Sequence, residues 1–505
     1  MGMKRLIFVC FYLVFSSAII LGLIGFKAYP LNGDYDLPNK PTYSDTSFLN
    51  AHYQDGFAEY IRTHNPLYEQ LIKINNQFRF TFFHTMPAGG VVESKDGVLM
   101  AEEHINSYYG DDFMGQKTWN YYMEMFDFVS DTLRKLNKPI VYVYVGSKPR
   151  IMDEYIPQKY RKPTPYSSNY KLYIQKLTKE NRLKFIDLAP YYLQVKDTAK
   201  IELYPKHSIH WSMYSVYLAT DTLAKTINRL LPQHEAALPV LKGFEVTTDE
   251  RDIEYELIRF MNMYYSYPRS VNHYPILNFT KKTAKNKPRV FVIGDSFGQM
   301  MNDFTFMYDA FNDSSVFLRY NAEYKRKNTP KQLYSIYNNF DYWQEFDNAD
   351  AVVFLSTEIN LKDFGLGFFE KAYNHFKGIN SFVDAYDANT VTRAEVNKEC
   401  IYTLKAGTAR STYFKNTNPN VQSGKKYKLT YWVKGKGELT LDFYPDFLPE
   451  TNHTYDSNDW KKYTWEFTMP VYSYPRVVLF RMYLEKRDTI ENELQLKNFK
   501  LEEVK

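Results

Sequence analysis

The feature that most constrains the fold is an alternation of short, uninterrupted apolar runs with segments of helical spacing. Residues 140–145 read Ile-Val-Tyr-Val-Tyr-Val, residues 290–293 read Val-Phe-Val-Ile, and residues 351–355 read Ala-Val-Val-Phe-Leu. Strands that are apolar at every position need cover on both faces, and the intervening helices supply it. The sequence therefore predicts an α/β fold with a parallel sheet and helices on both faces, whose ligand sites lie at the carboxyl ends of its strands.

The same patterns predict the other elements of this region. Residues 89–100 are expected to form a hairpin, because Asp96-Gly97 between two apolar runs is a tight-turn signal. Further strands are expected at 183–188 and 316–318. The expected helices are 57–83, 118–136, 170–180, 211–231 and 298–312.

A serine follows one of the apolar strands directly, in the tetrapeptide Gly294-Asp295-Ser296-Phe297. A serine on a sharp strand-to-helix turn is exposed, and the amide groups at the helix start can bind an oxyanion. Gly-Asp-Ser is also a common turn sequence, so the alternative is a serine that only caps the next helix. Its place after a buried strand favours Ser296 as a nucleophile.

A serine hydroxyl needs a base within hydrogen-bonding distance to act as a nucleophile at neutral pH. The segment His207-Ser208-Ile209-His210-Trp211-Ser212 lies at the start of a predicted helix and offers two histidines. His210 is the preferred base and His207 the second candidate. The alternative is that these histidines only cap or pack the helix start.

The chain changes character after about residue 376. Short alternating strands are expected at 427–433, 438–444, 462–468 and 477–483, separated by turn residues at 435–437 and 456–459. This pattern predicts a C-terminal β-sandwich, or jelly-roll, domain. The chain is rich in aromatic residues, at 18%. Trp432, Tyr444, Trp460 and Trp465 could form a sugar-stacking platform, although aromatic residues of a sandwich more often belong to its core.

The N-terminus predicts a membrane anchor. Lys4 and Arg5 precede 21 residues without a charge, Leu6 to Phe26, which is long enough to cross a bilayer as a helix. The positive flank favours a cytoplasmic N-terminus with the rest of the chain exported, and a cleaved signal peptide is the alternative. The domains expected are an anchor at 1–28, a linker at 29–47, an α/β domain at 48–375 and the β-sandwich at 376–505.

Composition argues against several other classes of protein. A net charge of +5 without a polybasic run gives no case for nucleic acid. The two cysteines, Cys10 and Cys400, exclude a cysteine-based zinc site. The sequence shows no Gly-rich phosphate loop and no metal-ligand spacing, so neither a metal nor a cofactor is expected.

Residues 50–370 resemble the alginate O-acetyltransferase-like SGNH family of exported enzymes that acetylate exopolysaccharides. The matching segments, in order, are 91–99, 142–157 with Lys148-Pro149, 209–212 with Ile-His-Trp-Ser, 294–297 with Gly-Asp-Ser-Phe, and 349–358 ending at Glu358. The histidine motif precedes the serine, the reverse of the usual order in SGNH esterases. Some members also carry a C-terminal carbohydrate-binding β-sandwich, which is what residues 376–505 look like.

The resemblance implies roles for individual residues. Ser296 would carry the acetyl group, His210 would act as the base, and Trp211 would wall the pocket. The family often has an Asp two residues before the histidine, where this chain has Ser208. Another acid would then orient His210, with Glu358 and Asp153 as candidates, or the site would work as a dyad. The candidates for orienting or oxyanion-binding roles are Asp295, Ser208, Glu358 and Gly294, and those for substrate binding are Trp211, Arg319, Trp432 and Trp460.

The function expected from the resemblance is a membrane-anchored O-acetyltransferase that acts on a cell-surface polysaccharide or exopolysaccharide. No cofactor is expected, because the resemblance implies that a multispanning membrane acyltransferase delivers the acetyl group. An exported carbohydrate esterase with the same Ser296 and His210 is one alternative. A catalytically inactive glycan-binding assembly protein is the other, since the missing Asp weakens the triad.

Overall fold

The computed structural model describes most of the chain from Asp45 onward. Described are a few isolated positions before residue 45 and residues 45–49, 51–163, 166–198, 201–249, 251, 253–265, 267–280, 286–327, 341–379, 383, 385–386, 391–405, 412–416, 421, 424–444, 451–469, 479–484 and 493–504. All statements below concern these residues.

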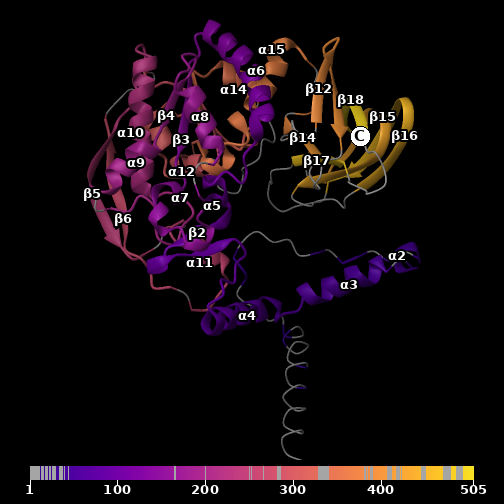
Figure 1. The fold of residues 1–505 in the computed structure, drawn as a ribbon, viewed down its shortest axis with the longest axis horizontal. Helices are drawn as coiled ribbons and strands as arrows, with labels where there is room; N and C mark the ends of the chain where they lie inside the picture. Colours follow the sequence, from indigo (N-terminus) through magenta and orange to yellow (C-terminus); the bar gives the residue numbers. More distant parts are fainter. Residues whose placement is uncertain are drawn as a thin grey trace, which may run out of the picture.

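A six-stranded sheet forms the centre of the larger part of the molecule (Figure 1). Its order is β4-β3-β10-β7-β8-β9, with β4 at Lys184–Asp187, β3 at Ile140–Val145, β10 at Ala351–Thr357, β7 at Val290–Gly294, β8 at Val316–Arg319 and β9 at Glu323–Lys325. The first five strands run parallel, and β9 turns back antiparallel to β8. The predicted α/β core is confirmed, but its sheet is mixed.

Two groups of helices accompany this sheet. One group contains α6 (Gly115–Lys135), α8 (Asn169–Leu177) and α15 (Phe368–Lys377); α6 contacts α15, and Trp119 of α6 packs on Tyr173 of α8. The other contains α10 (Met213–Leu230), α12 (Ser296–Asp303) and α13 (Phe306–Ala310), which contact one another. Figure 1 shows α6 and α10 on opposite sides of β3. The strands between them, β3, β7 and β10, are buried at every position, as their continuous apolar sequences predict.

Several short elements lie at the carboxyl end of the sheet. The predicted hairpin is β1 (Val91–Glu93) paired antiparallel with β2 (Leu99–Ala101), and α5 (Glu102–Tyr108) and α7 (Lys148–Ile151) follow β2 and β3. The sequence analysis missed α9 (Ala189–Lys196), the hairpin of β5 (Pro239–Thr247) with β6 (Asn272–Phe279), and α11 (Glu256–Phe260). The helix α11 turns out to carry a residue of the candidate site.

The C-terminal region is built from antiparallel strands that hydrogen-bond into one eight-stranded sheet. The strands in spatial order are β11 (Ala385–Tyr386), β14 (Thr412–Asn416), β17 (Leu479–Leu484), β15 (Lys426–Tyr444), β18 (Glu493–Glu503), β13 (Glu399–Lys405) and β12 (Val391–Val396), and β16 (Thr451–Thr468) pairs with β15. The first half of β15 pairs with β18 and its second half with β17. These strands form a β-rich C-terminal region with its own buried core, and its arrangement as a β-sandwich, or jelly roll, stays a prediction.

The predicted turns at 435–437 and 456–459 are wrong, because both segments continue as strand within β15 and β16. The pairing of these strands shifts between Val433 and Gly435. Gly435 has a φ of 118°, and a β-carbon there would lie 2.2 Å from the Glu493 carbonyl oxygen. Glycine therefore permits a bulge inside a long strand where the sequence suggested a turn.

Before the α/β core lie three helices, α2 (Asp45–Leu49), α3 (His52–Thr63) and α4 (Tyr68–Phe83). The helical segment predicted at 57–83 is thus divided, and Pro66 lies in the break. The anchor expected at 1–28 falls almost entirely outside the described residues. The linker expected at 29–47 is described in part, and its last residues, 45–47, belong to α2. Among the helices that the structure does describe, none has the length and apolar character needed to cross a bilayer.

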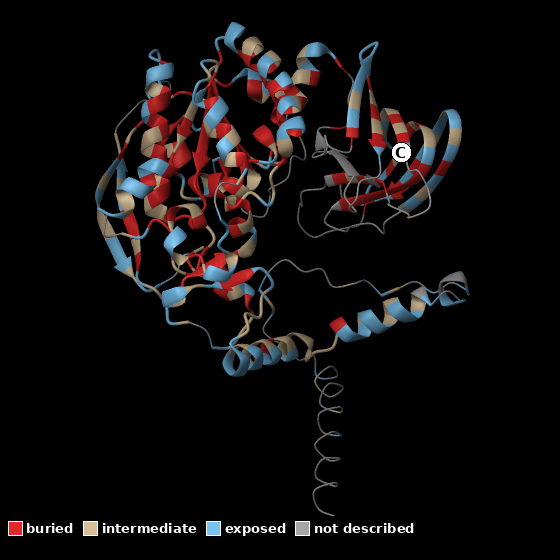
Figure 2. Ribbon diagram, in the orientation of Figure 1, coloured by how far each residue is buried: buried red, intermediate tan, exposed pale blue. Residues whose placement is uncertain are grey.

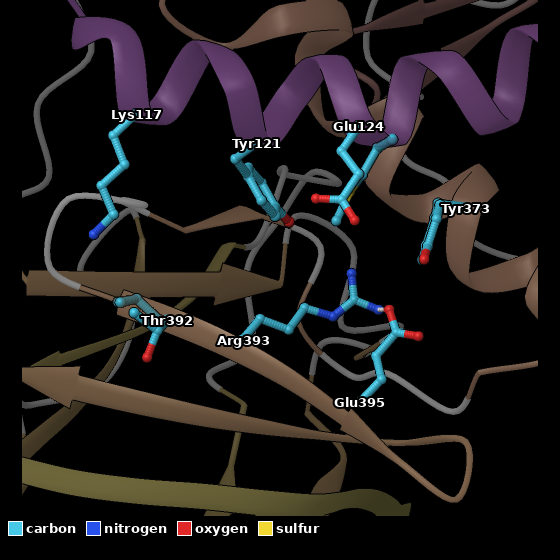
Figure 3. A pocket seen from close by; sticks show the side chains of 9 residues that line it. Lys117, Tyr121, Glu124, Tyr373, Thr392, Arg393 and Glu395 are labelled. Carbon is cyan, nitrogen blue, oxygen red and sulfur yellow. Dashed lines mark ion pairs between the residues drawn. The ribbon is translucent and has the colours of Figure 1, made fainter.

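The buried residues form two large clusters, which Figure 2 shows as two separate red interiors. One spans Met114 to Ala372 and the other Ile379 to Leu496. A cavity of about 230 Å³ lies between α6 and α15 on one side and β12 on the other, and Figure 3 shows Tyr121 and Tyr373 facing Arg393 across it. The predicted domain boundaries at 47/48 and 375/376 stay a prediction.

Candidate active site

Ser296 is the first residue of α12, directly after the turn that leaves β7. It lies at the carboxyl end of a central parallel strand and is partly exposed. Gly294 allows the turn to pass close to β10, since a β-carbon there would lie 3.2 Å from the Leu355 carbonyl oxygen and 3.0 Å from the Phe317 ring. The sequence prediction of a strand-to-helix turn at this serine is confirmed.

Asp295 holds this turn in place. Its fully buried carboxylate accepts hydrogen bonds from the Phe297 amide at 3.0 Å, the Thr357 amide and hydroxyl, both at 2.7 Å, and the Asn360 side chain at 2.9 Å. It is the N-cap of α12 and ties this helix to the end of β10. We therefore assign Asp295 a positioning role for Ser296.

His210 is oriented by a carboxylate that the sequence analysis did not name. Its Nδ1 lies 2.9 Å from both carboxylate oxygens of Glu256, on α11. Ser208 donates a hydrogen bond to the same carboxylate at 2.8 Å, and the Ile209 amide donates another at 2.6 Å. Glu256 therefore takes the part that the Asp two residues before the histidine often plays in the family.

The charge of Glu256 is stabilised in spite of its burial. Burial alone raises the pKa of this carboxyl, but the charge of His210 and the hydrogen bonds from His210 and Ser208 lower it to about 2. Glu256 is thus ionised at neutral pH, and it fixes the proton of His210 on Nδ1. The opposite nitrogen, Nε2, is then the one available to act as a base.

The expectation that Glu358 or Asp153 orients His210 is wrong. The Glu358 carboxylate is buried in an ion pair with Arg150, whose Nε lies 2.9 Å from Oε2, and it accepts a hydrogen bond from Ser147 at 3.0 Å. The Arg150 guanidinium in turn stacks 3.8 Å above the Tyr170 ring. Glu358 joins the ends of β3 and β10, and α11 brings Glu256 to His210 instead.

His210 and Ser296 approach each other through Phe297. The centres of the His210 and Phe297 rings are 4.8 Å apart, and Phe297 is the neighbour of Ser296 in the chain. Two segments more than 80 residues apart in the sequence therefore meet at the carboxyl end of β7. The order and distance of the motifs along the chain did not determine this contact.

Tyr320 also reaches Ser296. It occupies the turn after β8 with a φ of 50°, followed by Asn321 with a φ of 54°, so two residues adopt the left-handed conformation that disfavours bulky side chains. Burial raises the pKa of Tyr320, and hydrogen bonding with Ser296 partly offsets that effect. Tyr320, with its neutral hydroxyl, is a site residue that no pattern in the sequence indicated.

A buried lysine fixes the loop that carries His210. The Lys148 Nζ donates to four carbonyl oxygens: Leu99 and Pro205 at 2.7 Å, Lys206 at 2.8 Å and Ser208 at 3.1 Å. Its burial lowers the pKa of this amine to about 7. Lys148 therefore joins β2 to the loop just before His210, which explains the Lys148-Pro149 segment singled out in the sequence.

Two other histidines surround the site without serving as its base. The His207 ring packs between Tyr255 and Tyr267, with ring centres 5.4 Å away, and burial lowers its pKa to about 4. His104 on α5 is buried 6.2 Å from the Phe297 ring, and burial followed by the charge of His210 lowers its pKa to about 4. Both are neutral at pH 7, which leaves His210 as the base.

The predicted substrate contact by Trp211 is not supported. Its ring has no exposed surface and packs against Phe297 with 5.8 Å between ring centres, so it supports Phe297 from behind. Arg319 lies at the end of β8 opposite Gly294 and forms an ion pair with Glu323 at 2.9 Å. Arg319 is therefore near the serine turn, and its contact with substrate stays a prediction.

The tryptophans predicted for sugar binding divide between the surface and the core. Trp432 and Trp460 are half-buried on β15 and β16, and the Lys497 ammonium lies 4.6 Å from the Trp460 ring centre. Trp432 pairs with Lys462 and Lys497 on the neighbouring strands, so the two tryptophans share one face of the sheet. Trp465 belongs to the buried core, and the Tyr444 side chain lies outside the described residues.

Residues 108–309 match the family model described as "ALGX: SGNH hydrolase-like domain, acetyltransferase AlgX". A search of curated proteins gives no match.

Solved structures that resemble the chain include the O-acetyltransferase domain of Pseudomonas putida AlgJ, with 17% identity over 57% of this chain and 99% of that chain at a TM-score of 0.38. Pseudomonas aeruginosa AlgX has 10% identity over 82% of this chain and 95% of that chain, with a TM-score of 0.39. Bacillus cereus PatB1 has 13% identity over 55% of this chain and 98% of that chain, with a TM-score of 0.35. At such TM-scores, the functional assignment rests on the family match and on the geometry of the site.

Proposed function

We propose that the chain acetylates hydroxyls of a polysaccharide through a serine acyl-enzyme, because residues 108–309 match the model of the SGNH hydrolase-like acetyltransferase family. The observation that carries the proposal is the Glu256–His210 pair, which stands beside Phe297 and Ser296. A histidine oriented by a largely buried carboxylate near a partly exposed serine is the arrangement that nucleophilic acyl transfer requires.

In the first half-reaction, Ser296 attacks the carbonyl carbon of the acetyl donor while Nε2 of His210 accepts the hydroxyl proton. The tetrahedral intermediate carries its negative charge on the former carbonyl oxygen, where the Ser296 amide, the first of α12, can stabilise it. His210 then returns the proton to the departing group of the donor. The acetyl group is left as an ester on Ser296, and Glu256 stabilises the positive charge that His210 carries meanwhile.

In the second half-reaction, a sugar hydroxyl attacks the acetyl-serine and His210 accepts its proton. The new ester bond forms on the sugar as the bond to Ser296 breaks, and the serine oxygen recovers a proton from His210. If water attacks in place of the sugar, the same residues catalyse hydrolysis. An exported esterase is therefore the second candidate, and access of water to the acyl-enzyme separates the two.

The proposal extends to location and partners. The uncharged segment 6–26 supports an anchor that holds the chain in a membrane with its main body outside the cytoplasm. A multispanning membrane acyltransferase would then supply the acetyl group, without a cofactor bound to this chain. The C-terminal region, with Trp432 and Trp460 on one face, would hold the polysaccharide.

Mass spectrometry of the intact protein tests the acyl-enzyme directly. The full chain in detergent is incubated with an activated acetyl ester, beside Ser296→Ala and Glu256→Gln variants. We expect one acetyl adduct on the natural chain, none on Ser296→Ala, and slow formation on Glu256→Gln. Absence of a Ser296-dependent adduct from folded protein would remove the proposal and favour an inactive glycan-binding protein.

Oligosaccharide acceptors then separate transferase from esterase. A transferase passes the acetyl group from Ser296 to the sugar faster than to water, so acetylated oligosaccharide accumulates. An esterase releases acetate at the same rate with and without the acceptor, and its acyl-enzyme decays in buffer alone.

A further inference from the structure

The helix α4 exposes apolar side chains that a surface helix of a globular protein would bury against the core. Leu71, Ile74, Phe78 and Phe82 recur at the spacing of one helical stripe. The stripe would ordinarily be buried against the protein. In this structure it points outward, and the inner face makes mostly polar contacts.

Polar contacts dominate the inner face. The Asn76 side chain donates to the Met261 carbonyl at 2.9 Å, and the Gln77 side-chain oxygen accepts from the amides of Tyr264 and Tyr265 at 3.1 and 2.8 Å. Phe80 adds a ring contact with Tyr267 at 5.5 Å. The inner face of α4 is therefore fixed on residues 261–265 and on Tyr267.

The outer stripe is strongly exposed. Leu71 and Ile74 are each 54% exposed, Phe78 is 50% and Phe82 is 68%. The neighbouring Phe83 at the end of the helix is 65% exposed, and Tyr265 is 80% exposed. Figure 2 shows α4 apart from both red interiors. We call these six residues the α4 surface; large exposed apolar patches of this kind mark interaction sites.

We propose that the α4 surface lies in the interfacial layer of a lipid bilayer, with the axis of α4 parallel to the membrane. The proposal rests on the anchoring part of the proposed function, because the uncharged segment 6–26 would keep the helix near a bilayer. Aliphatic and Phe side chains on one face of a helix, with Tyr at its edge, are the composition of interfacial helices. Consecutive apolar residues at the helix end, Phe82 and Phe83, suit insertion among fluid acyl chains.

This placement orients the candidate active site. The segment 261–265 that holds α4 follows α11 directly, and α11 carries Glu256. Tyr267 packs on His207, three residues before His210. A helix that lies on the membrane is therefore joined through one loop to the residues that orient the base. The site would face the membrane, from which the proposed partner delivers the acetyl group.

Depth-dependent fluorescence quenching tests the proposal. In the full chain with Cys10→Ser and Cys400→Ala, a single cysteine replaces Phe78, or Ile74 as a second outward position, and carries a nitrobenzoxadiazole label. The protein is reconstituted in phosphatidylcholine–phosphatidylglycerol vesicles with and without bromine on the acyl chains. The control label replaces Lys135, an exposed residue at the end of α6.

We expect the labels at 74 and 78 to lose most of their fluorescence in brominated vesicles and the label at 135 to keep it. Bright labels at 74 and 78 on protein that floats with the vesicles would overturn the interfacial helix alone. Protein that does not float would overturn the anchoring as well. If the fluorescence of the labels at 74 and 78 changes only after a multispanning acyltransferase is added, a protein partner and not the bilayer covers the α4 surface.

Discussion

At the scale of single residues, the candidate site shows how a carboxylate can be supplied from a different part of the chain. Ser208 does not replace the Asp that often stands at its position; it hydrogen-bonds Glu256, which contacts His210. The backbone amides of Ile209 and His210 also point at the Glu256 carboxylate, at 2.6 and 3.1 Å. A triad is therefore assembled although its usual local motif is incomplete.

Glu256→Gln is expected to slow acylation of Ser296 on the order of 10²- to 10⁴-fold while leaving the fold intact. The amide keeps the shape of the side chain but cannot stabilise a positive His210. Rates of adduct formation measured by intact mass give the effect. The matched control is Glu323→Gln, which removes a carboxylate from the Arg319 pair outside the triad. Equal rates for Glu256→Gln and the natural chain would contradict the assignment.

Lys148→Met is expected to lower the free energy of unfolding by about 1–3 kcal/mol, because four carbonyl oxygens lose their buried donor. Urea denaturation followed by circular dichroism measures the loss. Lys184→Met, at an exposed position on β4, is the control and should change stability little. A Lys148→Met protein as stable as the control would show that the buried ammonium is dispensable.

His207 makes stability depend on pH in a direction that follows from its lowered pKa. In the folded state its pKa is about 4 and in the unfolded chain about 6.5, so the unfolded state binds more protons between these values. The His207 contribution is complete above about pH 6.5 and is lost as pH falls toward 4. As pH falls from 6.5 to 4, the denaturation midpoint should fall less steeply for His207→Phe than for the natural chain. An equal dependence of the midpoint on pH in both proteins would refute the assignment of His207 as a buried neutral histidine.

At the scale of elements, local turn signals were less reliable than apolar periodicity. The ends of the central strands agree with their predicted ends to within two residues; these strands are 140–145, 290–294 and 351–357. The reason is that a strand buried on both faces has a continuous apolar sequence. In the C-terminal region, residues 435–437 and 456–459 have turn composition but lie inside β15 and β16. Cross-strand hydrogen bonds on both sides of β15 outweigh the local preference of these residues.

Gly435→Ala is expected to destabilise the C-terminal region, because its β-carbon would meet the Glu493 carbonyl oxygen. The strain should lower the melting temperature of that region without changing the rate of Ser296 acylation. Calorimetry and the adduct assay separate the two effects. Gly89→Ala is the control, since a β-carbon there has open space. A loss of acylation equal to the loss of stability would link the bulge to the active site.

At the scale of the whole molecule, two buried cores meet at a polar junction. Arg393 of β12 donates to the Asn374 side chain of α15 at 2.5 Å and pairs with Glu395 at 3.1 Å; Figure 3 shows its guanidinium between Glu124 and Glu395. The buried Glu370 carboxylate lies 3.8 Å from the same guanidinium. Arg393 therefore joins the β region to the α/β core beside the 230 Å³ cavity, together with Tyr121 and Tyr373, which pack against both buried clusters.

Arg393→Ala is expected to uncouple the unfolding of the two regions. Calorimetry should then show two unfolding transitions that are further apart in temperature than those of the natural chain. The reason is the loss of the Asn374 hydrogen bond and of the ion pair with the buried Glu370. Lys436→Ala, which removes an exposed ion pair with Asp456, should leave the transitions unchanged. Identical melting curves for the two variants would mean that the regions are held together elsewhere.

The sequence by itself determined the α/β core, the strand-to-helix turn at Ser296 and the preference for His210, because burial periodicity and turn chemistry are local. Tertiary structure alone decided which carboxylate serves His210. Glu256 stands in a segment without a regular pattern, 46 residues after His210, and only the packing of α11 on the His207 loop brings them together. It also decided the outward orientation of α4, whose amphipathic sequence marks an apolar stripe but does not say whether protein or another medium covers it.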